Sequence, residues 1–351
     1  MEDEAEEQTF AVREKIMHWK FKASIQNAIS TLPHSVSFHL YYWMQRHFGE
    51  LRQSDPLSRL HAGVHIWQNI QSLGHDPKGK VFFEVGTGRA PVAPLAFWLM
   101  GARRIVTVDL NPYLKGEIVR EHLAYISNNQ DQVRGIFGDL LCPERLDALV
   151  RFSKRGRFEI EAFLALCRIE YVAPGDAART DLQDGSVDFH MSYTTLEHIP
   201  EDVLRDILKE GNRIVKRSGL FVHCIDYSDH FWHADQSIPA INFLQYSDRA
   251  WEHYAGNRYM YMNRLRHDDF LDLFSTAGHR LLKVVPEIDP RAHEMIAGRS
   301  FRVDDRFAGK TDEILSTINS LIISRKAGPA PTVASYRLRD GHAETIGFSR
   351  R

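Results

Sequence analysis

A short glycine-containing stretch at residues 81–91 constrains the fold of this chain more than any other part of the sequence. It begins with five residues of β-strand character, continues as Gly86-Thr87-Gly88, and leads into the apolar segment 92–100, which is typical of a helix. A strand, a glycine turn and a helix open the βαβ unit that binds nucleotide-containing cofactors. Glycine is favoured there because a side chain would keep the ligand away from the backbone, and because tight turns often need positive φ.

A second apolar segment, residues 104–109, adds information about the cofactor. It ends in Asp109, about twenty residues after Gly88, where an acidic residue meets ribose hydroxyls in such folds. The third glycine of the dinucleotide fingerprint is absent, since Pro91 stands in its place. Glu84 precedes the first glycine, where a carboxylate would repel a diphosphate but suits a ligand with an amino group and a sulfonium. The pattern therefore favours S-adenosylmethionine over NAD.

These motifs resemble those of the class I S-adenosylmethionine-dependent methyltransferases of the small-molecule, methyltransferase-11-like type, whose first motif has the form E-x-G-x-G. Segments similar to the later family motifs follow in the family's order, at residues 176–177, 184–189, 195–199 and 211–220. The resemblance covers roughly residues 78–230. It implies an α/β fold, a Rossmann-like doubly wound and mostly parallel sheet of seven strands in the order 3-2-1-4-5-7-6.

The chain is expected to contain three parts. Residues 1–76 form an N-terminal helical extension, residues 77–328 the methyltransferase domain, and residues 329–351 a tail. Connections in α/β folds are usually short, so the long stretches at about 131–168 and 227–266 are read as insertions. We expect the extension and these inserted lid segments to cover the cofactor, and a homodimer is compatible with the sequence.

The expected elements follow from hydrophobic periodicity and from glycine and proline positions. The strands are expected at residues 81–85, 105–109, 169–172, 187–192, 220–225, 279–286 and 318–325. Helices are expected at residues 57–73, 112–129, 202–217 and 268–277. Residues 287–313 are expected to form a charged loop.

The resemblance also implies which residues contact the cofactor. Those on its methionine side are Glu84, Gly86, Thr87 and Gly88. Those beside its ribose and adenine are Asp109, Leu110, Asp176 and Ala177. Those bordering its sulfonium are Ser192 and Tyr193.

Polar residues that follow the fourth and fifth expected strands are the catalytic candidates. Ligands bind at the carboxyl ends of strands in such sheets, and a hydroxyl acceptor must pass its proton to a histidine or carboxylate. The candidates are His230, His198, Asp226 and His233. For each histidine, a purely structural role is the competing interpretation.

A metal ion is the second interpretation of this group. Carboxylate and imidazole ligands suit Mg²⁺ or Mn²⁺, and the residues in question are Glu197, His198, Asp226 and His230. The ubiquinone-pathway type of methyltransferase uses a Leu-Glu-His segment similar to residues 196–198 for a metal. The same segment is structural in metal-free relatives, so a reaction without metal is the first prediction.

The predicted function is methyl transfer from S-adenosylmethionine to a small molecule, with a hydroxyl of a natural product or sugar favoured as the acceptor. One alternative is an N-methyltransferase that acts mainly by proximity. Another is a cofactor-binding scaffold or regulatory protein without activity. An NAD oxidoreductase is disfavoured by the missing third glycine.

Composition limits the partners. A formal charge of −2 gives no basic excess for bulk binding to nucleic acid or to a membrane surface. The longest apolar run, near residues 92–100, is too short to span a bilayer. The acidic first residues are unlike a targeting segment, and the three cysteines show no paired spacing. These features predict a cytoplasmic enzyme.

Overall fold

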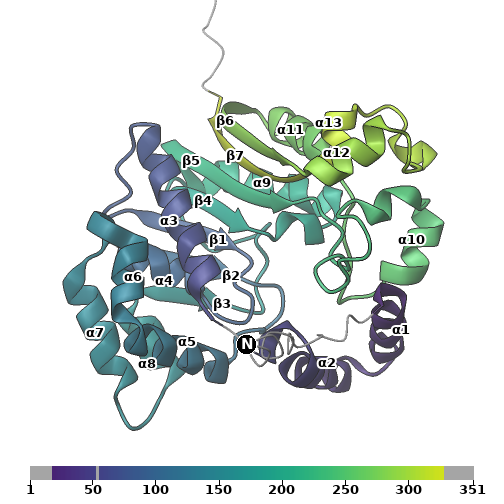
Figure 1. Cartoon of the computed structure of the whole chain (residues 1–351). Coiled ribbons are helices and arrows are strands. Elements are labelled where there is room, and N and C mark those ends of the chain that lie inside the picture. The colour runs from purple at the N-terminus through teal and green to yellow at the C-terminus, as the bar shows by residue number, and fades with distance from the viewer. Residues whose placement is uncertain (1–17, 53–54, 328–351) are drawn as a thin grey trace, which may run out of the picture.

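Seven strands form one mixed sheet, which Figure 1 shows through the middle of the molecule. The computed structural model describes residues 18–52 and 55–327. The strands are β1 (Val81–Val85), β2 (Arg104–Val108), β3 (Ile169–Val172), β4 (Val187–Tyr193), β5 (Val215–Asp226), β6 (His279–Ile288) and β7 (Thr317–Lys326). Their order is β3-β2-β1-β4-β5-β7-β6; β1 to β5 are parallel and β7 runs antiparallel between β5 and β6. The predicted fold class and strand order are confirmed.

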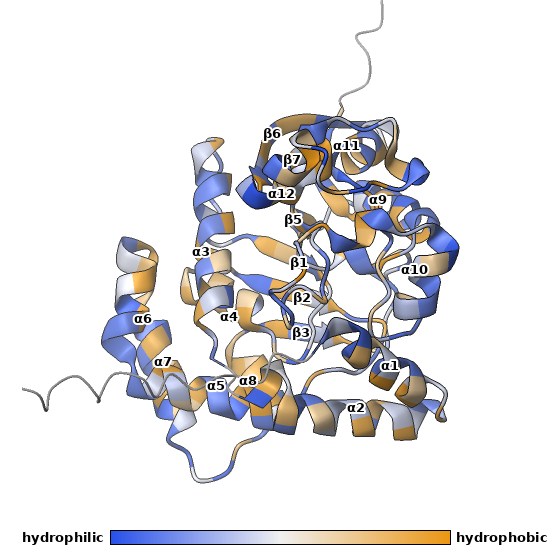
Figure 2. Cartoon of the chain, turned by 45° about the vertical axis from the view of Figure 1, so that its right-hand side comes forward, coloured by the Kyte–Doolittle hydropathy of each residue, from blue (hydrophilic) through white to orange (hydrophobic). Residues whose placement is uncertain are grey.

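Helices cover both faces of the sheet because the strands are apolar on both sides (Figure 2). Successive side chains of a strand point to opposite faces, so Phe82 and Phe83 join two different cores. The Phe82 core includes α3 (Leu57–Ser72), α4 (Val92–Leu99) and α5 (Gly116–Asn128). The Phe83 core includes α9 (Glu201–Ile214) and α11 (His267–Thr276).

The expected insertion at residues 131–168 contains three helices that extend the first helical layer. They are α6 (Gln130–Phe137), α7 (Pro143–Ser153) and α8 (Ile160–Leu166), and a 3₁₀ turn, η2 (Gly138–Leu140), joins the first two. Helix α6 packs on α3, and α7 packs on α4 and α5. Their apolar side chains belong to the Phe82 core. A covering role for this segment stays a prediction.

A third core joins the N-terminal helices to the long segment after β5. It contains aromatic and aliphatic side chains of α1 (Trp19–Ser30), the 3₁₀ turn η4 (Asn242–Gln245), α10 (Asp248–Ala255) and α12 (Pro290–Ala297). Helices α1 and α10 lie side by side in Figure 1. The backbone N–H of Trp19 also donates to Asp235 at 2.9 Å. The aromatic stretch after β5 therefore mainly forms a packed core. After α1, the chain continues through α2 (His34–Phe48) and η1 (Glu50–Arg52) to α3.

Two expected boundaries were wrong. Helix α9 ends at Ile214 rather than near residue 217, because Val215 already pairs with Val187 at the start of β5. Residues 287–313 are not a loop, since they contain α12, the turn η5 (Asp305–Phe307) and the first residues of α13 (Asp312–Ser316). Asp289 caps α12 by accepting a hydrogen bond from the N–H of Ala292. An aspartate is a favoured N-cap residue, but in this highly charged segment it did not stand out as the start of a helix.

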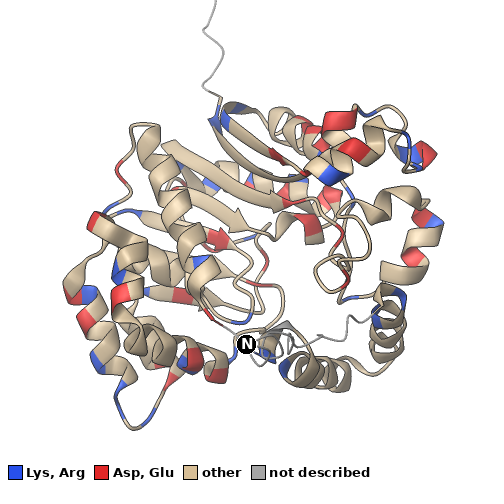
Figure 3. Ribbon diagram, in the orientation of Figure 1, with Lys and Arg blue, Asp and Glu red and all other residues tan. Residues whose placement is uncertain are grey.

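Charged residues lie mainly on the outer helices. Figure 3 shows both signs of charge spread over the outer helices, with acidic residues also at the ends of central strands. Within residues 18–52 and 55–327, no helix has the length and apolar character needed to cross a membrane. The predicted tail and the first part of the predicted extension lie outside the described residues.

Candidate active site

The glycine turn after β1 has the backbone geometry that the sequence predicted. Gly86 and Gly88 have φ values of 90° and 67°, in the region that favours glycine. A Cβ atom on Gly86 would lie 2.4 Å from a methyl carbon of Thr195. A side chain at Gly86 would therefore be strained and would also push away the segment after β4.

Asp109 closes this turn from the end of β2. Its Oδ2 accepts the backbone N–H of Gly88 at 2.9 Å, and its Oδ1 accepts that of Asn111 at 3.4 Å. Burial raises the pKa of Asp109, although these N–H groups oppose the shift. A pocket of about 230 Å³ lies between α2 and residues 111–115, which follow Asp109 in the chain, and includes Phe38 and Tyr113 in its wall. The contact of Asp109 with ribose hydroxyls stays a prediction.

Glu84 is buried at the end of β1 and belongs to a chain of hydroxyl contacts. Its Oε2 accepts from the Thr107 hydroxyl at 2.5 Å, and the hydroxyls of Thr107 and Thr87 lie 2.7 Å apart. Burial raises the pKa of Glu84 to about 7, while the Thr107 hydrogen bond lowers it in part. Glu84 is therefore close to half protonated at neutral pH, when no cation lies beside it.

Binding of S-adenosylmethionine should release protons from Glu84 near pH 7. The ammonium group of the cofactor stabilises the carboxylate, so the pKa of Glu84 falls in the complex and affinity rises as the pH passes upward through about 7. Calorimetry in buffers of different ionisation enthalpy measures this release directly. Glu84→Gln should abolish it, and equal release by that variant would contradict the placement of Glu84 beside the amino group.

The predicted adenine side shows a mixed picture. Leu110 is 71% exposed and Ala177 is buried. Asp176 is exposed, and its Oδ1 accepts the N–H of Ala178 at 2.8 Å. The N–H of Gly175 donates to the carbonyl of Asp109 at 2.9 Å, which holds the two loops together. The loops are adjacent as an adenine site requires, and the individual contacts stay predictions.

The two residues predicted beside the sulfonium differ in their surroundings. Ser192 is fully buried and its hydroxyl lies 2.8 Å from Nδ1 of His223. Tyr193 is half-buried at the end of β4, with the guanidinium carbon of Arg59 5.8 Å from its ring centre. Of this pair, Tyr193 is the side chain at the edge where ligands bind.

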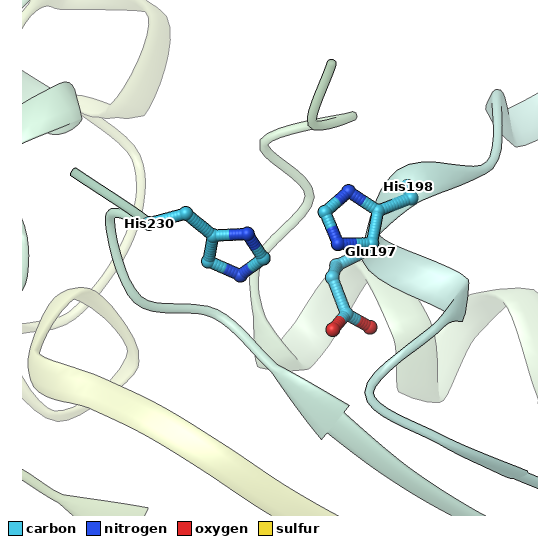
Figure 4. Close-up of side chains that lie close together, drawn as sticks. All are labelled: Glu197, His198 and His230. Atoms are coloured by element: carbon cyan, nitrogen blue, oxygen red, sulfur yellow. The ribbon is translucent and has the colours of Figure 1, made fainter. Parts of the chain in front are cut away.

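Beyond β4 and β5, three side chains converge, as Figure 4 shows. Glu197 and His198 lie on the turn η3 (Leu196–His198), and His230 lies on the loop after β5. One donor atom from each residue lies within 4.8 Å of the others. The two imidazole rings meet edge to face, with centres 4.8 Å apart.

A second group shares His230 and adds two predicted residues. Asp226 Oδ2 lies 3.4 Å from Nε2 of His230 and 3.4 Å from Nε2 of His233. The Ser228 hydroxyl is also 3.3 Å from Nε2 of His233. The structure therefore brings together all four predicted catalytic residues and Glu197.

The protonation states within this cluster differ. Burial raises the pKa of Glu197 well above its usual value, the nearby Asp226 carboxylate adds to the rise, and adjacent backbone N–H groups offset only part of it. Burial also raises the pKa of Asp226, but contacts with His230 and His233 outweigh it and hold that pKa well below normal. Burial therefore favours the neutral form of Glu197, whereas the neighbouring histidines favour the ionised form of Asp226.

His198 has a defined tautomer. Its Nδ1 lies 2.8 Å from the carbonyl oxygen of Tyr261, which can only accept, so Nδ1 carries the proton and Nε2 keeps its lone pair. Desolvation by the surrounding protein, and then the nearby His230, lower the pKa of His198. The solvent exposure of the residue limits this decrease. His198 is thus a neutral imidazole at pH 7.

Other polar residues near β5 serve the core. His223 is fully buried between Ser192 and His190. Asp229 accepts from the side-chain amide of Asn242 at 2.8 Å, and Asp235 holds the start of α1. The dense run of histidines and carboxylates in the sequence therefore divides between the candidate site and structural positions.

Two residues of this region were not identified from the sequence. Thr107 is level with Glu84 in the parallel pairing of β1 and β2, and its signal was a polar residue within an otherwise apolar strand. Arg59 comes from the start of α3, about twenty-five residues before the glycine turn, and nothing in the sequence pattern connects it to the site.

Comparison with known proteins gives one family match. Residues 152–223 match the model of a methyltransferase domain, which spans β3, β4 and most of β5. No curated protein matches the chain.

Solved structures of related fold were also found. Geranyl diphosphate C-methyltransferase from Streptomyces coelicolor A3(2) is 13% identical, with 76% of this chain and 79% of that chain covered and a TM-score of 0.43. A methyltransferase from Methanosarcina mazei is 13% identical, with 74% and 97% covered and a TM-score of 0.40. These scores lie below 0.5, so the assignment depends on the molecule's own features and the family match. The strand order and the glycine turn closed by Asp109 are those of the class I S-adenosylmethionine-dependent methyltransferase fold, and residues 152–223 match a methyltransferase domain.

Proposed function

We propose that this enzyme methylates a hydroxyl group of a small molecule, with His230 as the general base. The observation that carries the proposal is the position of His230, whose Nε2 lies 3.4 Å from Asp226 Oδ2 and which lies beside Glu197 and His198. An imidazole beside a carboxylate is stabilised when it takes a proton. An amine acceptor would need no such group.

The reaction is an in-line displacement in which the protein supplies position and proton transfer. The acceptor oxygen forms a bond to the methyl carbon while the carbon–sulfur bond breaks, and that electron pair returns to sulfur. The hydroxyl proton passes to His230, and Asp226 stabilises the resulting imidazolium. His198 lies beside His230 and, as a neutral imidazole, can accept a hydrogen bond through Nε2 from a second polar group of the acceptor molecule.

A metal-assisted version of the same reaction fits the cluster. Both carboxyl oxygens of Glu197 and Nε2 of His230 are buried without a hydrogen-bond partner among the described residues, as ligand atoms awaiting a cation would be. Glu197, His198, His230 and Asp226 would hold Mg²⁺ or Mn²⁺, which lowers the pKa of a bound hydroxyl. Protein residues would then fix the acceptor in place.

Identification of the methylated atom tests the proposal. Incubation of candidate metabolites with S-adenosylmethionine labelled with ¹³C in the methyl group, followed by two-dimensional NMR of the product, distinguishes O-methyl from N-methyl and C-methyl groups. We expect an O-methyl signal. An N-methyl product formed equally well by a His230→Ala enzyme would instead support an amine methyltransferase that acts by proximity.

A further inference from the structure

Arg59 is a charged side chain near the carboxyl end of β4, and methyl transfer by His230 and Asp226 gives it no role. It lies in the first turn of α3 and is exposed. Helix α3 is fixed firmly, because Leu60, Ile66 and Ile70 are fully buried in the Phe82 core. The start of this helix therefore presents Arg59 from a rigid support.

The surroundings of Arg59 are the end of β4 and the end of β1. Its guanidinium carbon lies 5.8 Å from the ring centre of Tyr193, a cation–π distance. Tyr193 and Glu84 point to the face of the sheet that α3 covers. Tyr193 packs against the Phe82 core, and Glu84 is two residues after Phe82 in β1, so both of these β1 side chains point to the same face. Strands β1 and β4 are neighbours at the point where the strand order reverses, which is where ligands bind in open α/β sheets.

The charge of Arg59 is not balanced locally. Among the described residues, no hydrogen bond or ion pair of its guanidinium is found, and Tyr193 is its one ring contact. The carboxyl groups of Glu84 and Glu197 feel its charge at a distance, but neither forms an ion pair with it. An arginine prefers a planar anion that accepts two parallel hydrogen bonds.

We propose that Arg59 binds the carboxylate of the methionine part of S-adenosylmethionine. Glu84 on β1 binds the amino group, and Arg59 on α3 binds the carboxylate. The amino-acid end of the cofactor is thus held between β1 and α3. The N-terminal helical extension thereby contributes directly to the cofactor site. This inference depends on the cofactor and is independent of the acceptor's identity.

Calorimetry with two ligands tests it. S-adenosylhomocysteine carries the carboxylate, whereas 5′-methylthioadenosine has the same adenosine and sulfur without the amino-acid group. Arg59→Ala should weaken S-adenosylhomocysteine binding by roughly 10- to 100-fold, the range for a hydrogen-bonded charged group. It should leave 5′-methylthioadenosine binding unchanged, and Arg59→Lys should restore part of the loss.

Arg103 provides the control, because it is exposed just before β2, at the opposite edge of the sheet. Arg103→Ala should bind both ligands normally. Equal weakening of both ligands by Arg59→Ala would indicate a structural role and overturn the proposal. Unchanged S-adenosylhomocysteine affinity with a raised KM for the acceptor would also overturn it, by assigning Arg59 to an anionic acceptor.

Discussion

His230→Ala should lower kcat by about 10²- to 10⁴-fold, the usual contribution of a general base. The imidazole lies 3.4 Å from Asp226 and contacts His198, so its removal takes away the proton acceptor without opening the cofactor site. S-adenosylhomocysteine affinity should stay nearly constant in calorimetry. His253→Ala, at an exposed histidine of α10, is the matched control and should keep full turnover.

Metal binding separates the metal-free reaction from the metal-assisted one. If a metal is present, Mn²⁺ should bind to the wild type in electron paramagnetic resonance titrations and bind far more weakly to Glu197→Gln. Turnover should then be lost with a chelator and return with Mg²⁺ or Mn²⁺. If His198→Ala abolishes turnover and His230→Ala does not, the base assignment moves from His230 to His198.

Trp19→Ala should lower the free energy of unfolding by about 3–5 kcal/mol, the usual cost of truncating a buried aromatic residue to alanine. Trp19 is 3% exposed and its ring packs against Phe231, Trp251 and Tyr254. Since Phe231 follows His230 directly, loosening this core should also reduce turnover more than cofactor affinity. Denaturant unfolding and steady-state kinetics measure the two effects.

Trp43→Ala is the control for this experiment. Trp43 lies on α2 and is 50% exposed, so its removal should change the unfolding free energy by well under 1 kcal/mol. A Trp19→Ala enzyme with normal stability and normal kcat would show that the N-terminal helices do not support the catalytic loop.

The sequence could predict what local spacing determines. Gly86, Gly88 and Asp109 lie within one βαβ unit, where turn geometry and strand length fix their relation, so their grouping was predictable. The alternation of side chains along β5 likewise separated His223 from Asp226, and the structure places His223 in the core beside Ser192.

Contacts between distant segments were beyond the reach of sequence patterns. Arg59 meets Tyr193 only because α3 packs on the same face of the sheet as β4. Likewise, the sequence named Glu197 as a candidate metal ligand, but its burial, which raises its pKa, depends on the packing around η3. The split of residues 223–235 between site and core also depended on the loop's path, which has no periodic signal.

A crystal structure with S-adenosylhomocysteine tests the central claim most directly, because it fixes the sulfur atom relative to the catalytic cluster. We predict ribose hydroxyls on Asp109, the amino-acid end between Glu84 and Arg59, and the sulfur directed past Tyr193 toward His230 and Asp226. A sulfur atom directed away from His230, with the cluster of Glu197, His198, Asp226 and His230 on the far side of the cofactor, would contradict the account.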